Sequence, residues 1–325
     1  MREKILLGII FFLLSPSLVA QQHLVDSIKA ELGKPMADSN RALSMMRLAI
    51  DYEVLDTAKA FRAYEDAIHF ANDKKLYYQL GRIYQNQSFL FSTTGNYSRA
   101  VESLDKAIEN YQRSGHAKAR LWEANAYNDK ANILKTQNEF QQAVDYYMKA
   151  ISLMEEMKLY DKLTNSYSNL ANIFGDLAEA EKENEYALKA VEMAKKSGSR
   201  QHIFIAYFIL TNARVKIPDV AGSKRFLDSA RAYFNEEENV DNIDILFSFY
   251  LVSAQVFRVA NELDSAFYFF KKSYDLSTTY NYGYGKAESQ LQMGAVSLLQ
   301  KHYPEAERFL LSGIADAKAI SYFGM

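Results

Sequence analysis

The chain has 325 residues and a formal net charge of −2, with 38 Lys and Arg against 40 Asp and Glu. It contains no cysteine, which excludes a disulfide framework and a thiolate metal site. The basic residues form no stripe of the kind that contacts phosphate backbones, so we expect no nucleic-acid partner. With 49% hydrophobic residues but only 13 Gly and 4 Pro, the composition favours a packed helical protein over a sheet.

The first twenty residues differ from the rest of the chain. Arg2 and Lys4 precede an apolar run over residues 5–14, and Ser15-Pro16-Ser17 is expected to break a helix before Ala20. This pattern predicts a cleavable secretory signal over residues 1–20, cut after Ala20. An uncleaved anchor is the alternative, but ten apolar residues are short for a bilayer. We therefore expect an exported, periplasmic or otherwise extracytoplasmic bacterial protein with no membrane span in its mature chain.

Residues 21–39 follow as a short helix and a loop around Gly33-Lys34-Pro35. No linker rich in Pro, Ser or Gly divides the chain after this point. We therefore treat residues 40–325 as one continuous array.

A three-residue pattern recurs through this array every 40 to 43 residues. Most copies have a small residue, a bulky one four positions later and a small one three positions after that. The copies are Ala60-Tyr64-Ala67, Ala100-Leu104-Ala107, Ala143-Tyr147-Ala150, Glu183-Ala187-Ala190, Ser223-Leu227-Ala230, Ala266-Phe270-Ser273 and Ala306-Leu310-Gly313. Self-similarity at this period is typical of a solenoid, in which each unit covers the apolar face of its neighbour.

A second marker supports the same register. Sixteen residues before five of these copies stands a tyrosine, and a small residue often follows four positions after that slot. The tyrosines are Tyr84, Tyr127, Tyr167, Tyr207 and Tyr250, and the small residues are Ser88, Ala131, Ala171, Thr211, Ala254 and Gly294. Small slots allow helix backbones to approach closely.

Each unit is interpreted as two antiparallel helices. In one unit, helical spacing predicts helices over residues 121–136 and 140–154, joined by Gln137-Asn138-Glu139. Equivalent turns are predicted at Gly95-Asn96, Pro218-Asp219, Asn261-Glu262 and Lys301-His302, and links between units at Ser114-Gly115, Lys158, Ser197-Gly198-Ser199, residues 236–239 and Asn281-Tyr282-Gly283. The predicted fold is an all-α solenoid of about seven antiparallel helix pairs.

The repeat resembles the tetratricopeptide repeat family. Tyr167, Leu170, Ala171 and Phe174 match the first half of that motif, and Ala143 with Tyr147 and Ala266 with Phe270 match the second. The resemblance covers residues 40–325, although the late Pro is missing and each unit is longer than the usual 34 residues. It implies a right-handed superhelix whose first helices line a concave groove. The long unit and the export signal together are similar to exported bacterial signalling proteins.

No set of residues predicts catalysis. The histidines lie far apart, with no H-E-x-x-H spacing, and glycines are too sparse for a phosphate-binding loop; they are His23, His69, His116, His202 and His302. A cluster of four glutamates is interpreted as a solvated face at the start of a helix, where the helix dipole stabilises negative charge. They are Glu179, Glu181, Glu183 and Glu185. We expect no enzyme activity, metal or cofactor.

One amide-rich pattern suggests a binding site. Asn132, Asn172, Asn212 and Gln255 each lie five residues after a marker tyrosine, and Asn125, Asn128 and Asn165 lie close to these tyrosines. An amide offers a donor and an acceptor, which suits the backbone of an extended peptide. A carboxylate of the ligand would be bound by basic residues close to these amides, which are Lys130, Lys135 and Arg258. The alternative is that these amides hydrogen-bond neighbouring helices and only hold the spacing.

The resulting prediction is a non-catalytic scaffold that binds a protein or an extended peptide. The alternative is the sensory repeat region of a bacterial membrane signal-transduction protein, a histidine kinase or a transcriptional regulator, of which this chain is a fragment. Aromatic clusters such as residues 247–250 and 267–270 are expected to be core, or else to line a ligand pocket. An uncapped end near Ile320, Tyr322 and Phe323 predicts self-association.

Overall fold

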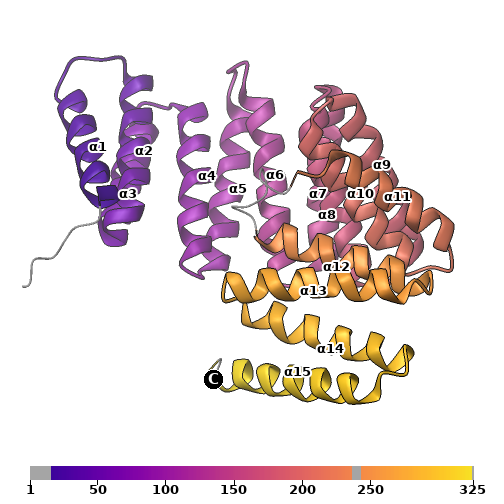
Figure 1. Ribbon diagram of the computed structural model, residues 1–325. Coiled ribbons are helices and arrows are strands. Elements are labelled where there is room, and N and C mark those ends of the chain that lie inside the picture. Colours follow the sequence, from indigo (N-terminus) through magenta and orange to yellow (C-terminus); the bar gives the residue numbers. More distant parts are fainter. Residues whose placement is uncertain (1–15, 236–242, 324–325) are drawn as a thin grey trace, which may run out of the picture. The chain divides into compact units, whose positions relative to one another are not determined.

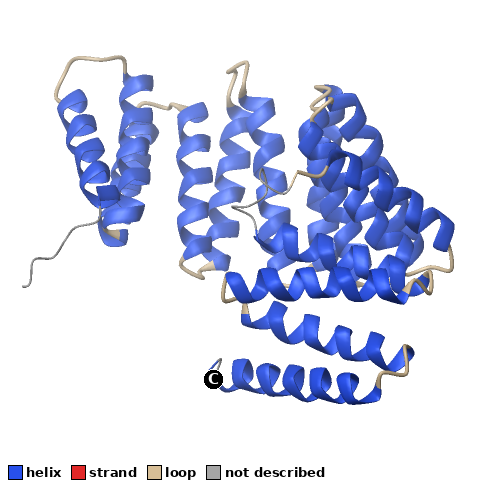
Figure 2. Ribbon diagram, viewed as in Figure 1, coloured by secondary structure: helices blue, strands red, loops and turns tan. Residues whose placement is uncertain are grey.

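The computed structural model describes residues 16–235 and 243–323, and the side chains of residues 21–235 and 243–320. Every regular element in these ranges is an α-helix, and no strand occurs in them (Figure 2). The predicted all-α array of helix pairs is confirmed. The chain divides into two compact units, residues 1–153 and 154–325, and each is described by itself.

The first unit contains six whole helices and most of a seventh (Figure 1). Helix α2 packs on α3 and α4 packs on α5, while α3 contacts α4 and α5 contacts α6 to join one pair to the next. The helices are α1 (Pro16–Leu32), α2 (Asp38–Leu55), α3 (Thr57–Asp73), α4 (Tyr77–Thr93), α5 (Tyr97–Arg113), α6 (Ala119–Thr136) and α7 (Phe140–Glu156).

The second unit begins near the end of α7 and continues the same arrangement. Its pairs are α8 with α9, α10 with α11, α12 with α13, and α14 with α15. The helices are α8 (Tyr160–Asp176), α9 (Ala180–Ser197), α10 (Arg200–Val215), α11 (Val220–Tyr233), α12 (Ile243–Val259), α13 (Leu263–Thr279), α14 (Gly283–Leu299) and α15 (Tyr303–Phe323).

The residues of the repeated pattern form the core of both units. All seven copies are buried except for Leu310, which is half-buried, and the six small residues after the tyrosine slot are buried as well. Their small size has a direct consequence at Gly294, where an added Cβ would lie 2.7 Å from Cγ of Leu310. Close approach of α14 and α15 therefore depends on this slot, as the sequence predicted.

The aromatic clusters are mostly core. Phe247, Phe249, Tyr250 and Phe270 are buried, whereas Tyr268 is exposed. These rings bury large apolar areas between paired helices, which is the main source of stability in such an array.

The predicted turns lie between helices. Positive φ angles between 54° and 61° occur at Asn138, Asn261, Asn281 and Lys158. The φ angles of Gly95 and Gly198 are also positive, at 78° and 69°. This left-handed conformation is typical of the residue that ends a helix. Pro218 lies between α10 and α11, and Pro304 is in the first turn of α15. The link predicted at residues 236–239 lies outside the described residues.

The amino-terminal helix differs from the expectation. Pro16 and Ser17 begin α1 instead of interrupting a helix, and α1 runs on past Ala20 to Leu32. Proline suits a helix start because its missing N–H has no partner there in any case. Gln21 Nε2 donates to Asp51 Oδ1 on α2 at 3.1 Å, and Val25 and Ile28 are buried. The signal sequence stays a prediction, since residues 1–15 lie outside the described residues.

Candidate functional site

A pocket of about 230 Å³ lies between α4 and α6, the first helices of two neighbouring pairs. Residues spaced three, four and seven apart share one face of a helix, and this spacing brings the lining residues together. They are Gln85, Ser88, Phe89 and Ser92 on α4 and Asp129, Asn132 and Ile133 on α6. We call this the α4–α6 pocket. It includes Asn132, one of the predicted binding residues.

A directional chain of hydrogen bonds holds the polar wall of the pocket. The Tyr111 hydroxyl on α5 donates to Gln85 Oε1 at 2.7 Å, and Gln85 Nε2 donates to Asp129 Oδ2 at 2.7 Å. Burial raises the pKa of the Tyr111 hydroxyl, so it stays protonated and acts as the donor. Because Gln85 Oε1 is the acceptor, its NH₂ group must face Asp129. The carboxylate is thereby fixed at the pocket.

Asn132 has a structural partner as well as a place in the pocket. Its Oδ1 accepts from the Tyr147 hydroxyl on α7 at 2.5 Å, and its side chain is half-buried. Burial also raises the pKa of the Tyr147 hydroxyl. The amide therefore combines the two roles that the sequence left as alternatives: it bonds to a neighbouring helix and it lines a pocket.

Lys130 does not serve as the predicted carboxylate-binding residue. It is buried, its Nζ lies 2.5 Å from Asp105 Oδ1 on α5, and it is 4.2 Å from the ring centroid of Tyr146. Burial lowers the pKa of Lys130, but hydrogen bonds to Asp105 and Tyr146 outweigh that effect and raise the pKa. That expectation was wrong because Lys130 is already paired with the carboxylate of Asp105, whose own side chain is 55% exposed.

The other predicted residues differ in exposure. Asn125, Asn128 and Lys135 are half-buried on α6, whereas Asn165 and Asn172 are exposed on α8. Asn212 on α10 and Gln255 and Arg258 on α12 are half-buried. Arg258 Nη1 donates to Gln292 Oε1 on α14 at 3.2 Å, so it joins two first helices. A binding role for these residues stays a prediction.

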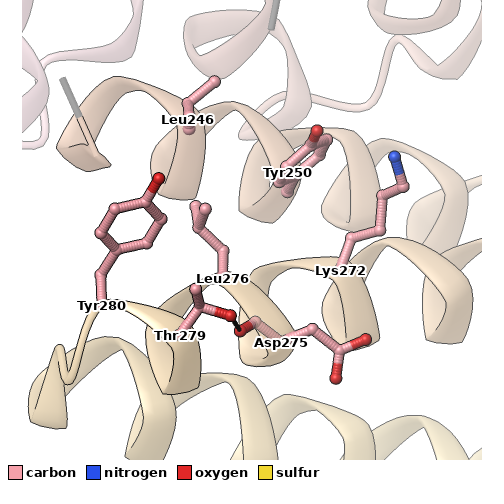
Figure 3. A pocket seen from close by; sticks show the side chains of 7 residues that line it. All are labelled: Leu246, Tyr250, Lys272, Asp275, Leu276, Thr279 and Tyr280. Atoms are coloured by element: carbon pink, nitrogen blue, oxygen red, sulfur yellow. Dashed lines mark hydrogen bonds between the residues drawn. The ribbon is translucent and has the colours of Figure 1, made fainter. Parts of the chain in front are cut away.

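A second pocket of about 370 Å³ lies between α12 and α13, within one pair (Figure 3). Lys272 Nζ lies 5.1 Å from the ring centroid of Tyr250, and the Thr279 hydroxyl donates to the backbone oxygen of Asp275 at 2.9 Å. The lining residues are Leu246, Tyr250, Lys272, Asp275, Leu276, Thr279 and Tyr280. Tyr250 was a sequence marker, but the residues of α13 were missed, although their spacing places them on one helix face.

Neither a cluster of metal-binding side chains nor a membrane-spanning helix is found in the part of the chain that the structure describes. Over residues 16–235 and 243–323, no three or more His, Asp or Glu residues are grouped so that they would hold a metal ion. None of the helices in the same ranges combines the length and apolar character that a bilayer crossing requires.

The predicted self-association surface is only partly described. Ile320 on α15 is 39% exposed, and Leu311 and Ile314 on the same helix are exposed too. The side chains of Tyr322 and Phe323 lie outside the described residues. Self-association therefore stays a prediction.

Comparison with known proteins decides the nature of the repeat. Residues 76–156, which include the whole α4–α6 pocket, match the tetratricopeptide repeat family. Residues 76–156 contain tetratricopeptide repeats. This confirms the resemblance that the sequence motifs indicated. No curated protein sequence matches the chain.

Solved structures extend the tetratricopeptide fold to most of the chain. The apo form of RapI is 12% identical with a TM-score of 0.65, covering 86% of this chain and 99% of RapI. The apo quorum sensor NprR from B. thuringiensis is 12% identical with a TM-score of 0.63, covering 93% of this chain and 84% of NprR. A signal transduction ATPase with a tetratricopeptide repeat sensor from Pyrococcus horikoshii is 16% identical with a TM-score of 0.68. The match covers 91% of this chain and 44% of the ATPase. At these identities the likeness concerns the fold.

Proposed function

We propose that this tetratricopeptide repeat protein is a non-catalytic scaffold that binds a protein or an extended peptide outside the cytoplasm. The observation that carries the proposal is the α4–α6 pocket, which places Asn132 beside apolar and charged groups on two successive first helices. A pocket on this face suits a ligand side chain, while the neighbouring amides suit a ligand backbone.

The amides on α8 support the same proposal. Asn165 and Asn172 are both exposed, and seven residues separate them, so they lie on one face two turns apart. Their Cα atoms are about 10 Å apart along the helix axis. Three residues of an extended chain span about the same length. An amide pair with this spacing is able to bond two peptide groups of one strand-like ligand.

The extracytoplasmic location rests on the sequence of residues 1–20. A basic start, a ten-residue apolar run and a small residue at position 20 are the features of an export signal. The absence of cysteine from the chain fits either redox compartment, so it does not bear on this part of the proposal.

The proposal is tested by capturing partners with the immobilised full chain from a bacterial cell-envelope extract. Wild type and an Asn132→Ala, Asn172→Ala double variant are compared, with bound proteins identified by mass spectrometry. Asn72→Ala is the matched control, since Asn72 is an exposed amide on a second helix, α3. We expect the double variant alone to lose recovery of a partner. Equal recovery by all three chains, with unchanged circular dichroism, would refute the amide role.

A second candidate is the sensory repeat region of a bacterial membrane signal-transduction protein. It is favoured by the likeness in fold to a quorum sensor and to a tetratricopeptide repeat sensor of a signal transduction ATPase. The reading frame beyond Met325 tests it. A spanning helix followed by a kinase or DNA-binding region would support this candidate, and a stop codon would rule it out.

A further inference from the structure

Another pocket, of about 300 Å³, lies in the second unit, between the start of α8 and the end of α9. We call it the lysine pocket, because three of its seven lining residues are lysines. The lining consists of Lys158, Leu159, Tyr160, Asp161 and Lys162 at the start of α8, and Lys196 and Ser197 at the end of α9. Three lysines against one aspartate give it a net formal charge of +2.

Among the described residues, two of the three lysines have no anionic partner. The side chains of Lys158 and Lys162 make no hydrogen bond and no ion pair in the ranges 16–235 and 243–323. Lys196 differs, because its Nζ lies 2.6 Å from Glu192 Oε1, and this hydrogen bond raises the pKa of Lys196. The positive charge that remains for an incoming anion is therefore that of Lys158 and Lys162.

Asp161, the acidic lining residue, is paired with neither of these two lysines. Its Oδ1 lies 3.1 Å from Nδ1 of His202 on α10. The Asp161 side chain is 61% exposed, so water screens its charge. Asp161 offsets part of the positive charge, and the lining as a whole keeps an excess of it.

The amount of charge distinguishes between two classes of anion. A phosphate monoester carries about −1.5 to −2 near neutral pH and offers three acceptor oxygens, which matches two lysines without counter-ions. A carboxylate carries a single charge and would leave one of the lysines uncompensated. Planar bidentate recognition of a carboxylate also favours arginine, and no arginine lines this pocket, whereas lysine binds phosphate as a compact point charge.

The other lining residues suit the organic group that carries the phosphate. Leu159 and Tyr160 are both half-buried, and the ring of Tyr160 offers an apolar surface of fixed shape. The volume of about 300 Å³ is at the lower limit of the ~300–1,000 Å³ of small-molecule sites. A phosphate together with a small carrier such as one ring therefore fits the pocket.

We propose that the lysine pocket binds a phosphate monoester of a small organic molecule, with Lys158 and Lys162 on the phosphate and Tyr160 against its carrier. This site goes beyond the proposed function and does not depend on it. No lining residue of the lysine pocket belongs to the residues predicted to bind a peptide, so either site is able to bind its ligand without the other.

The experiment is isothermal titration calorimetry of the purified full chain, with phenyl phosphate, inorganic phosphate and benzoate as probes. A pH of about 8 and a fixed ionic strength keep both phosphates doubly charged. Wild type is compared with the double variant Lys158→Gln, Lys162→Gln and with Tyr160→Leu. Gln79 stands in α4 where Lys162 stands in α8, two residues after the helix start, so glutamine is compatible with this position.

The matched control is the double variant Lys75→Gln, Lys118→Gln. It removes the same charge from two exposed lysines in the links before α4 and α6. Lys75 also has the same φ angle as Lys158, 54°. Circular dichroism checks that every variant is folded, and the single variant Lys162→Gln replaces the double variant if the latter is not.

We expect wild type and the control to bind phenyl phosphate more tightly than benzoate. Loss of both lysines should weaken binding of phenyl phosphate about 10-fold or more, the effect of losing one charge-assisted hydrogen bond or more, and Lys162→Gln alone should weaken it several-fold. Tyr160→Leu should weaken phenyl phosphate several-fold and leave the affinity for inorganic phosphate unchanged.

Three results would overturn the assignment. Absence of phenyl phosphate binding by wild type, or equal binding by wild type and the lysine variants, would exclude the site. Benzoate bound as tightly as phenyl phosphate would exclude recognition of a phosphate. Inorganic phosphate bound as tightly as phenyl phosphate would exclude the role of Tyr160 and identify free phosphate as the ligand. None of these results bears on partner capture, so the proposed function fails or stands separately.

Discussion

At the scale of single residues, Glu183 is the clearest departure from the repeat. It occupies a slot that holds Ala or Ser in the other copies, and it is 3% exposed. Lys216 directly follows the carboxyl end of α10, and its Nζ lies 2.7 Å from Glu183 Oε1. Gly175 on α8 makes room for the pair, because an added Cβ would lie 2.8 Å from that oxygen. Interpreting Glu183 as part of a solvated face was therefore wrong, while Glu179, Glu181 and Glu185 are exposed.

Removing the partner of Glu183 should destabilise the fold. Lys216→Met leaves a buried carboxylate without its cation, which costs ~3–5 kcal/mol in fully buried pairs. Because Lys216 is itself 40% exposed, we expect a loss of about 2 kcal/mol in the free energy of unfolding, measured by urea denaturation. The double variant Glu183→Ala, Lys216→Met restores the residue type of the repeat and should regain most of this loss. An equally unstable double variant would contradict this account.

Glu53 gives a prediction about pH. Burial raises the pKa of its carboxyl, and the hydrogen bond from the Tyr64 hydroxyl at 2.5 Å offsets part of that rise. A carboxyl whose folded-state pKa is raised lowers stability as pH rises through that pKa. We therefore expect Glu53→Gln, which still accepts from Tyr64, to melt higher than wild type near pH 7. The difference should vanish near pH 3, where Glu53 is protonated in the folded and the unfolded chain, and a gain that persists there would contradict the titration.

At the scale of elements, the turns show what a sequence predicts well. Asn138, Asn261 and Gly198 were placed in turns because Gly and Asn tolerate left-handed backbone, and each has a positive φ. Ala178 has a φ of 57°, yet nothing in its residue type indicates it. Its position follows from the end of α8 and the start of α9 around it.

Replacing Ala178 with glycine should therefore stabilise the folded chain. A left-handed Ala costs roughly 1–2 kcal/mol, part of which Gly loses again through its freer unfolded chain. We expect Ala178→Gly to raise the free energy of unfolding by about 0.5 kcal/mol and Gly198→Ala to lower it by about 1 kcal/mol. An added Cβ at Gly198 meets no atom within 4 Å, so only its backbone matters. Thermal melts of both variants measure the change in stability. A change in the same direction for both variants would contradict this explanation.

The helix pairs and the core were predictable because they depend on local spacing, whereas the pocket depends on neighbouring helices. Asn132 was found from its offset to Tyr127. Gln85 and Asp129 were missed, because their hydrogen bond joins residues 44 positions apart. Phe89 was missed because exposure of a large ring on α4 is decided by what packs around it. The signal available was a polar residue on each of two successive first helices, Gln85 on α4 and Asp129 on α6.

At the scale of the whole molecule, stability is spread along the array. Each unit repeats the same buried slots, and consecutive pairs are joined by contacts such as α3 with α4 and α9 with α10. In such a chain, stability is close to a sum of pair and interface contributions. Loss of a few residues at one end therefore affects the first pair and leaves the rest of the array folded.

This bears on export, because cleavage after Ala20 would remove the first five residues of α1. Gln21, Val25 and Ile28, which hold the rest of α1 on α2, would all remain. We therefore expect the full chain, expressed in a Gram-negative bacterium, to appear in the periplasm with Gln21 as its first residue by amino-terminal sequencing. Ile9→Arg, which places a charge in the apolar run, should keep it in the cytoplasm. A wild-type chain that keeps Met1 would disprove cleavage. If that uncleaved chain is found in the membrane fraction, residues 1–20 act as an anchor, and if it is found in the cytoplasm, the chain is not exported.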